Sequence, residues 1–144
     1  MKAIRFYKDG ALHRTDGPAV IWSDGRKEWW EDGSLTNVRC IPNEMTDDMA
    51  SFWFKNGIFH RKDGPAVSSG WGYEAYYVYG KPHRIGGPAI IWPNVHNGST
   101  SRKEWWVDGV LHRDDGPAII RSDGTKEWWA NGKCIKKTKP NFPD

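Results

Sequence analysis

The sequence predicts an all-β fold, an elongated single-sheet meander of about five 23-residue β-hairpin repeats. Three observations predict it: glycines recur at nearly constant spacing, a pair of aromatic residues precedes each of them, and Asp-Gly, Asn-Gly and Gly-Pro steps return every few residues. Turn signals this frequent leave room for strands rather than helices. A short period sustained along the chain is typical of a repeat architecture.

The repeat is defined by six glycines with spacings of 23, 24, 23, 29 and 23 residues: Gly10, Gly33, Gly57, Gly80, Gly109 and Gly132. Four residues before each glycine stands the first ring of the pair: Phe6, Trp29, Trp53, Tyr76, Trp105 and Trp128. Three residues before it stands the second ring: Tyr7, Trp30, Phe54, Tyr77, Trp106 and Trp129. Neighbouring residues of a strand point to opposite faces, so each face of the sheet should carry a ladder of rings.

Each unit reads as two strands joined by a tight turn. In the unit that ends at Gly33, the segments 18–23 and 26–31 are rich in β-branched and aromatic residues and flank Asp24-Gly25, a strong hairpin signal. The proline of each Gly-Pro-Ala step stands first in its strand, where a sheet permits it. The aspartates that precede these steps should cap the turn with their side chains: Asp16, Asp63 and Asp115.

One ladder of rings has a predicted cover and the other has none. The second residue after each repeat glycine is mostly apolar and should cover one ladder: Leu12, Leu35, Phe59, Pro82, Leu111 and Cys134. We expect the uncovered aromatic face to curl on itself, to self-associate or to offer a groove to a partner. The simple alternative is that both ladders are core.

Residues 1–136 are assigned to one repeat domain and residues 137–144 to a short polar tail. The unit 33–56 is irregular, because Thr36-Asn37 replaces His-Arg and no Gly-Pro-Ala follows. We expect a helical turn in place of strand pairing within 37–51. Residues 93–101 form a loop insertion. Partner contacts are expected in both irregular segments, with Asp47 and Asp48 in the first.

Composition limits the function classes. A chain of 144 residues has room for one domain, and a net charge of +3 with 27% charged residues is too weakly basic for a dedicated binder of long nucleic acid. The N-terminal residues lack the apolar core of a signal peptide, and no apolar run is long enough for a membrane span. We expect a cytoplasmic protein, in the host cytoplasm if it is encoded by a virus, in which Cys40 and Cys134 are packing residues.

A turn motif of the form HRxDGPA occurs at 13–19, 60–66, 83–89 and 112–118, the third copy carrying Gly in place of Asp. With the aromatic pairs it resembles the MORN family of β-hairpin repeats, and most of all its divergent HRxDGPA type found in bacteria, bacteriophages and large DNA viruses. The resemblance covers about residues 5–136. It implies an elongated, non-enzymatic scaffold for protein association or self-association, and lipid-headgroup binding has been proposed for such repeats.

The repeated histidine and arginine do not form a converging site. Equivalent histidines lie roughly 10 Å or more apart along the sheet, too far to share one metal ion. An active site needs different groups at one point, whereas this chain repeats the same groups along a line, so no catalytic residue, metal or cofactor is expected. We predict a structural pair between each turn arginine and a strand glutamate, as in Arg113 and Glu127. Alternatively, repeated Arg and Trp hold a nucleotide or phosphate group.

The sequence therefore predicts a non-enzymatic repeat scaffold that binds a protein partner, as a phage or viral host-interaction or defence-inhibitor protein does. The alternative is a sequestering module for a nucleotide or another phosphate-bearing ligand. A homo-oligomer is also expected. The candidate binding residues are Trp30, Trp106, Trp129, Tyr77, Arg14, Arg61, Arg84, Arg113, Asp47 and Asp48.

Overall fold

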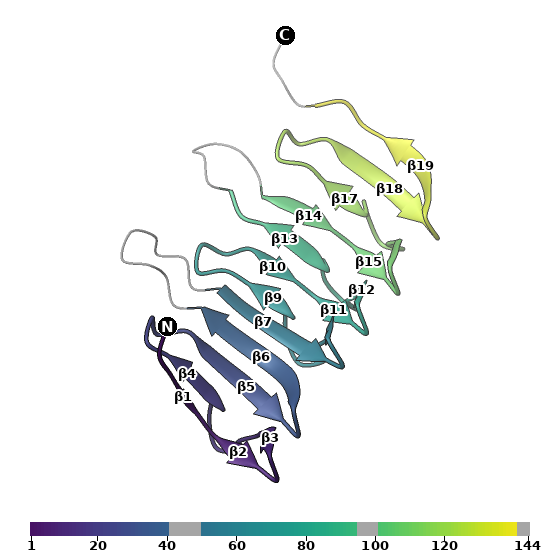
Figure 1. Ribbon diagram of the computed structural model, residues 1–144. Coiled ribbons are helices and arrows are strands. Elements are labelled where there is room, and N and C mark those ends of the chain that lie inside the picture. The colour runs from purple at the N-terminus through teal and green to yellow at the C-terminus, as the bar shows by residue number, and fades with distance from the viewer. Residues whose placement is uncertain (41–49, 95–100, 141–144) are drawn as a thin grey trace.

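A computed structural model describes residues 1–40, 50–94 and 101–140 of the chain. These residues contain no helix, and they form one large antiparallel meander with small hairpins along one side, as Figure 1 shows. The predicted all-β, single-sheet fold is confirmed. None of the described segments is a helix that could cross a membrane.

The main sheet runs from one end of the molecule to the other, almost in chain order (Figure 1). Its strands, in spatial order, are β1 (Ala3–Arg5), β4 (Val20–Trp22), β5 (Lys27–Glu31), β6 (Ser34–Cys40), β7 (Ala50–Lys55), β9 (Val67–Ser68), β10 (Glu74–Ala75), β13 (Ile90–Trp92), β14 (Arg102–Glu104), β17 (Ile119–Ile120), β18 (Lys126–Ala130) and β19 (Lys133–Lys137). Each strand pairs only with its spatial neighbours. The molecule is therefore an elongated single layer.

A small hairpin projects at four of the six repeat glycines: Gly10, Gly57, Gly80 and Gly109. The pairs are β2 (Tyr7–Lys8) with β3 (Ala11–Leu12), β7 with β8 (Ile58–Phe59), β11 (Tyr77–Val78) with β12 (Lys81–Pro82), and β15 (Trp106–Val107) with β16 (Val110–Leu111). At each tip, the repeat glycine and the residue before it both have positive φ, as in Asp108 (49°) and Gly109 (78°). A type I′ turn requires this, and it suits the twist of the two strands.

The apolar residues of the hairpins lie beside the second rings. The sequence predicted such a cover for one ladder without indicating which. Each second ring lies opposite the apolar residue that follows the turn, so that Trp106 pairs with Leu111 and Tyr77 with Pro82. Successive hairpins also contact one another at their tips. A Cβ placed on Gly132 would lie 3.1 Å from a methyl group of Val110 in the preceding hairpin. Small tip residues therefore allow the units to stack closely.

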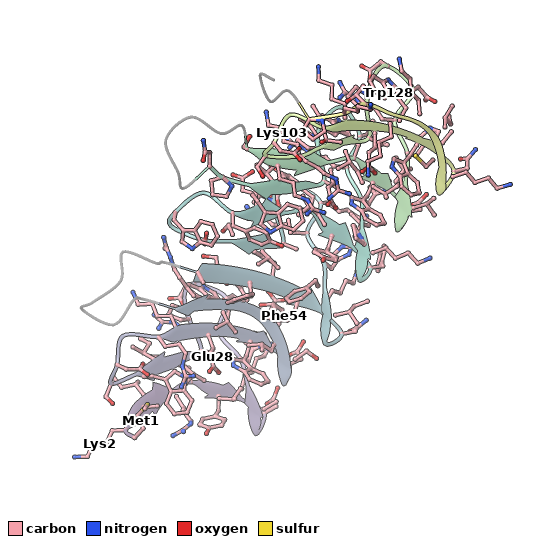
Figure 2. The ribbon with its side chains drawn as sticks, turned by 90° about the horizontal axis from the view of Figure 1, so that it is seen from above. Met1, Lys2, Glu28, Phe54, Lys103 and Trp128 are labelled. Carbon is pink, nitrogen blue, oxygen red and sulfur yellow. The ribbon has the colours of Figure 1, made fainter. Side chains whose placement is uncertain are left out.

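The core is narrow, because a single layer has no second sheet to pack on. The alanines of the four Gly-Pro-Ala steps are completely buried: Ala19, Ala66, Ala89 and Ala118. The neighbouring positions Val20, Ile90 and Ile119 are also buried. Side chains project from both faces along the whole sheet, as Figure 2 shows. Stability must therefore come from contacts between adjacent units.

The described residues of the irregular unit form the strands β6 and β7 rather than a helical turn. β6 begins at Ser34 directly after the turn and runs back along β5, with a bulge opposite the bond between Trp29 and Trp30. It then pairs with β7. The prediction of a helical turn is wrong for 37–40 and 50–51, because these residues extend the sheet. Asp47, Asp48 and most of the 93–101 insertion lie outside the described residues.

Candidate functional site

The arginine of each HRxDGPA turn lies on the face of a first ring. The distance from the guanidinium carbon to the ring centroid is 4.1 Å for Arg14 on Phe6, 4.2 Å for Arg61 on Trp53, 4.0 Å for Arg84 on Tyr76 and 4.0 Å for Arg113 on Trp105. The turns thus supply a cover of cations at these four first rings. The sequence predicted that one of the two ladders would lack a cover without indicating which, and it did not predict this layer of arginines.

Two further groups hold each guanidinium in place. In Arg113 the Nε atom donates to Asp115 at 2.8 Å, and a terminal nitrogen donates to the backbone oxygen of Pro117 at 3.1 Å. Arg14 and Arg61 make the same two bonds, whereas Arg84 keeps only the bond to Pro88, since Gly86 replaces the aspartate. The arginine bond lowers the pKa of each aspartate below its ordinary value: Asp16, Asp63 and Asp115.

The predicted pairs between turn arginines and strand glutamates do not form. Glu127 is almost fully buried and accepts from Trp129 at 3.0 Å and from Arg121, the residue after β17, at 2.9 Å. Burial raises the pKa of Glu127, but the bonds from Trp129 and Arg121 outweigh this and leave it lowered. The glutamate and the turn arginine project from opposite faces of the sheet. The correlation between the two in the sequence reflects a shared repeat rather than a contact.

The turn histidines join one unit to the next. The Nδ1 atom of each accepts from the backbone N–H at the tip of the following hairpin: His13 from Asp32, His60 from Tyr79, His83 from Asp108 and His112 from Asn131, at 2.9–3.1 Å. These ring nitrogens thus fix the turn of the neighbouring unit. Each turn histidine therefore makes a structural hydrogen bond between units.

The candidate binding residues separate onto two faces. Trp30, Trp106 and Trp129 each donate the indole N–H to the glutamate two residues earlier, and Tyr77 packs on Phe59 with ring centroids 5.5 Å apart. The four turn arginines lie on the other face. Arg and Trp of the predicted set therefore form no common groove.

A groove does open where the repeat breaks. It has a volume of about 450 Å³ and lies between the first rings Trp29 and Trp53. The other lining residues are Glu31, Thr36, Asn37, Arg39, Ser51, Arg61 and Ser68. Strands β5, β6, β7 and β9 supply all of them except Arg61. Because β6 replaces the HRxDGPA turn of this unit, no turn among the described residues covers this part of the sheet.

Trp29 differs from the other first rings. Lys136 of β19 lies 4.7 Å from the centroid of Trp128, so five first rings carry a cation within the described residues. Trp29 is the one first ring there that carries none. Its partner across the strands is Asn37, which occupies the position that Lys136 takes opposite Trp128. The polar residue that faces Trp29 is thus an amide and not a cation.

Several polar groups of the groove have no partner. The side-chain oxygen of Asn37 is buried without a hydrogen bond, although the residue is only 8% exposed. A buried acceptor without a donor costs free energy, which a ligand can recover. Glu31 and Arg39 are exposed and make no side-chain hydrogen bond or ion pair with other described residues. The groove therefore contains three polar side chains that have no partner among the described residues.

Sequence reasoning missed these groove residues, Arg61 aside. The sequence does contain a signal, because Thr36-Asn37 replaces His-Arg in this unit. If each turn arginine covers a first ring, the unit without that arginine must have a first ring without a cation. Among the described residues, no cluster of His, Cys, Asp and Glu could hold a metal ion. No protein-family model matches the sequence, and no curated protein matches it either.

Proposed function

We propose that the protein is a non-enzymatic repeat scaffold that binds a protein partner at the break in its repeat. One observation carries this proposal. The repeated His, Arg and Glu groups are bonded within the fold, whereas the unpaired Asn37, Glu31 and Arg39 share one open groove with Trp29. Groups that a fold leaves unpaired in a concave place are those that a partner can satisfy.

A role in recognition fits this geometry better than catalysis. A general base needs a free proton acceptor beside a reacting group. The turn histidines already use Nδ1 to accept a backbone N–H. The resemblance to HRxDGPA repeats of phages and large DNA viruses supports a host-interaction or defence-inhibitor role in the cytoplasm.

Native mass spectrometry of the protein purified from cells tests this function. We expect a specific co-purifying protein with the wild type and its loss with Trp29→Ala. Trp128→Ala is the matched control, because it removes the equivalent ring at the C-terminal end and should leave the partner bound. A partner that is retained by Trp29→Ala would place recognition elsewhere on the scaffold, and no co-purifying protein at all would contradict the scaffold role.

A second candidate function is the sequestration of a nucleotide or another phosphate-bearing ligand. The unpaired Arg39 favours it, because the hydroxyl groups of Ser51 and Ser68 line the same groove. A cation and two hydroxyl donors are suited to a phosphate, and a bare indole ring is suited to a base. A small anionic molecule that is retained in the same mass spectra would support this candidate instead.

A further inference from the structure

We propose that the groove at Trp29 binds the guanidinium group of an arginine side chain that belongs to a partner polypeptide. This rests on the proposed protein-binding function and names the chemistry that the partner must bring. The template for it is inside the molecule, in the sites that hold Arg14, Arg61 and Arg113 on their rings.

Each of these internal sites consists of the same three groups. The guanidinium lies on an aromatic face, its Nε atom donates to a carboxylate, and a terminal nitrogen donates to a carbonyl oxygen. For Arg61 these groups are Trp53, Asp63 at 2.8 Å and the oxygen of Pro65 at 3.3 Å. Such a set combines cation–π attraction with charge-assisted hydrogen bonds.

The groove offers the same three groups, and no cation of the described residues lies on its ring Trp29. The ring is Trp29, the carboxylate is that of Glu31 and the carbonyl oxygen is the unpaired amide oxygen of Asn37. All three residues line the groove, and the amide oxygen is buried in its wall. Asn37 and Glu31 both need a donor, and a guanidinium supplies several in a planar fork. An incoming arginine would therefore complete the arginine layer at the unit where the chain itself omits it.

The positive charges around the groove place a second demand on the partner. Arg61 is already compensated by Asp63, so its charge opposes a ligand weakly. Arg39 is uncompensated and lies opposite Lys27, which stands four residues before Glu31 on β5. At about 3.3 Å per residue, Arg39 and Glu31 are about 13 Å apart along the strand direction. A carboxylate near the arginine of the partner would meet Arg39, so we expect an arginine with an acidic neighbour.

The direct test uses a short peptide with one arginine and one aspartate, followed through the indole N–H and side-chain amide NMR signals of Trp29 and Asn37. We expect saturable shifts of both signals. The same peptide with citrulline, which keeps the shape but loses the charge, should bind at least tenfold more weakly. No shift with the arginine peptide, or equal binding of the citrulline peptide, would overturn the proposal.

Asn37→Lys is the decisive variant, because it places an internal cation where Lys136 covers Trp128. It should raise the melting temperature and abolish binding of the arginine peptide. Lys136→Asn is the matched control, which should lower the melting temperature and leave the peptide affinity unchanged. Peptide binding that survives in folded Asn37→Lys would contradict the proposal.

Titration with adenosine monophosphate and with inorganic phosphate separates the anionic alternative. If the groove holds an anion, these probes should shift the same signals more strongly than the arginine peptide, and Asn37→Lys should bind them more tightly. That outcome would overturn the guanidinium assignment. A co-purifying protein that Asn37→Lys retains would also overturn it, while leaving the proposed scaffold function in place.

Discussion

At the scale of single residues, each turn arginine joins its own turn to an aromatic ring of the sheet. The recurrence of Arg14 and its equivalents indicated a structural role inside the repeat, but the predicted partner was a strand glutamate. The structure assigns the arginine to a ring, an aspartate and a carbonyl oxygen of its own turn. The alternation of side chains along a strand determines which face a strand residue occupies. This alternation does not determine where the long side chain of a turn residue lies.

Removal of one turn arginine should cost stability without involving the buried glutamate. Arg113→Ala loses the ring contact with Trp105 and the bond to Pro117, so we expect the free energy of unfolding to fall by about 1 to 2 kcal/mol. A double-mutant cycle of Arg113→Ala with Glu127→Gln, measured by urea unfolding, should be additive within about 0.5 kcal/mol. A larger coupling energy would mean that Arg113 and Glu127 interact, which the structure contradicts.

His60 should make stability depend on pH. Burial lowers the pKa of His60 below its ordinary value of 6.5, and the charges of Lys55 and Lys62 lower it further. The pKa of His60 is therefore lower in the folded state than in the unfolded state. The stabilisation by the neutral ring is present above the unfolded pKa and is lost as pH falls through the folded pKa. Protonation then removes the nitrogen that accepts the Tyr79 N–H. The stability difference between wild type and His60→Gln should shrink from about pH 8 to about pH 5 in urea unfolding. A difference independent of pH would exclude this linkage.

At the scale of elements, the sequence predicted the strands and turns but not the way in which they are layered. Alternation and turn dipeptides located the hairpins, because these patterns are local. The extension of β6 beside β5 could not be predicted in this way, since Thr36-Asn37 removes a turn signal without naming its replacement. The groove depends on that long-range pairing. The motif could therefore indicate which unit lacks an arginine on its ring, but not which residues of neighbouring strands would line the groove.

The glycine of each Gly-Pro-Ala step should be required by the arginine that lies over it. A Cβ on Gly116 would lie 2.9 Å from the guanidinium carbon of Arg113, and the φ of this residue imposes no other need for glycine. Gly116→Ala should displace Arg113 from Trp105 and lower the melting temperature. In an Arg113→Ala background, the same change should cost much less, because the clash is gone. An equal cost in both backgrounds would assign the glycine a backbone role instead.

At the scale of the whole molecule, each unit depends on its neighbours alone. The meander has no second layer, and its ends are the edges of β1 and β19 (Figure 1). Covering of the first rings by cations removes the bare aromatic face that was expected to drive self-association. The remaining routes are the two edges, and β19 carries Lys133, Lys136 and Lys137, which discourage edge pairing. Because the molecule is elongated and has no core common to all units, the stability of each unit depends on its immediate neighbours.

Local stability should be measurable when one hydrogen-bonded carboxylate is changed at either end of the sheet. Glu28 accepts from Trp22 and Trp30, and Glu127 accepts from Trp129, Arg121 and Lys137. Substitution by Gln removes the charge from these bonds and should cost about 1 to 3 kcal/mol in either case. In a globular domain with one core, that loss would speed amide hydrogen exchange everywhere.

In this single layer, the loss should stay near the changed unit. We expect Glu127→Gln to speed exchange in β17, β18 and β19 and to leave β4 and β5 unchanged, while Glu28→Gln does the reverse. Hydrogen exchange followed by mass spectrometry of peptides from the two ends measures both patterns. Exchange that rises equally at both ends in both variants would mean that the sheet unfolds as one cooperative unit, because only then would a defect at one edge reach the other.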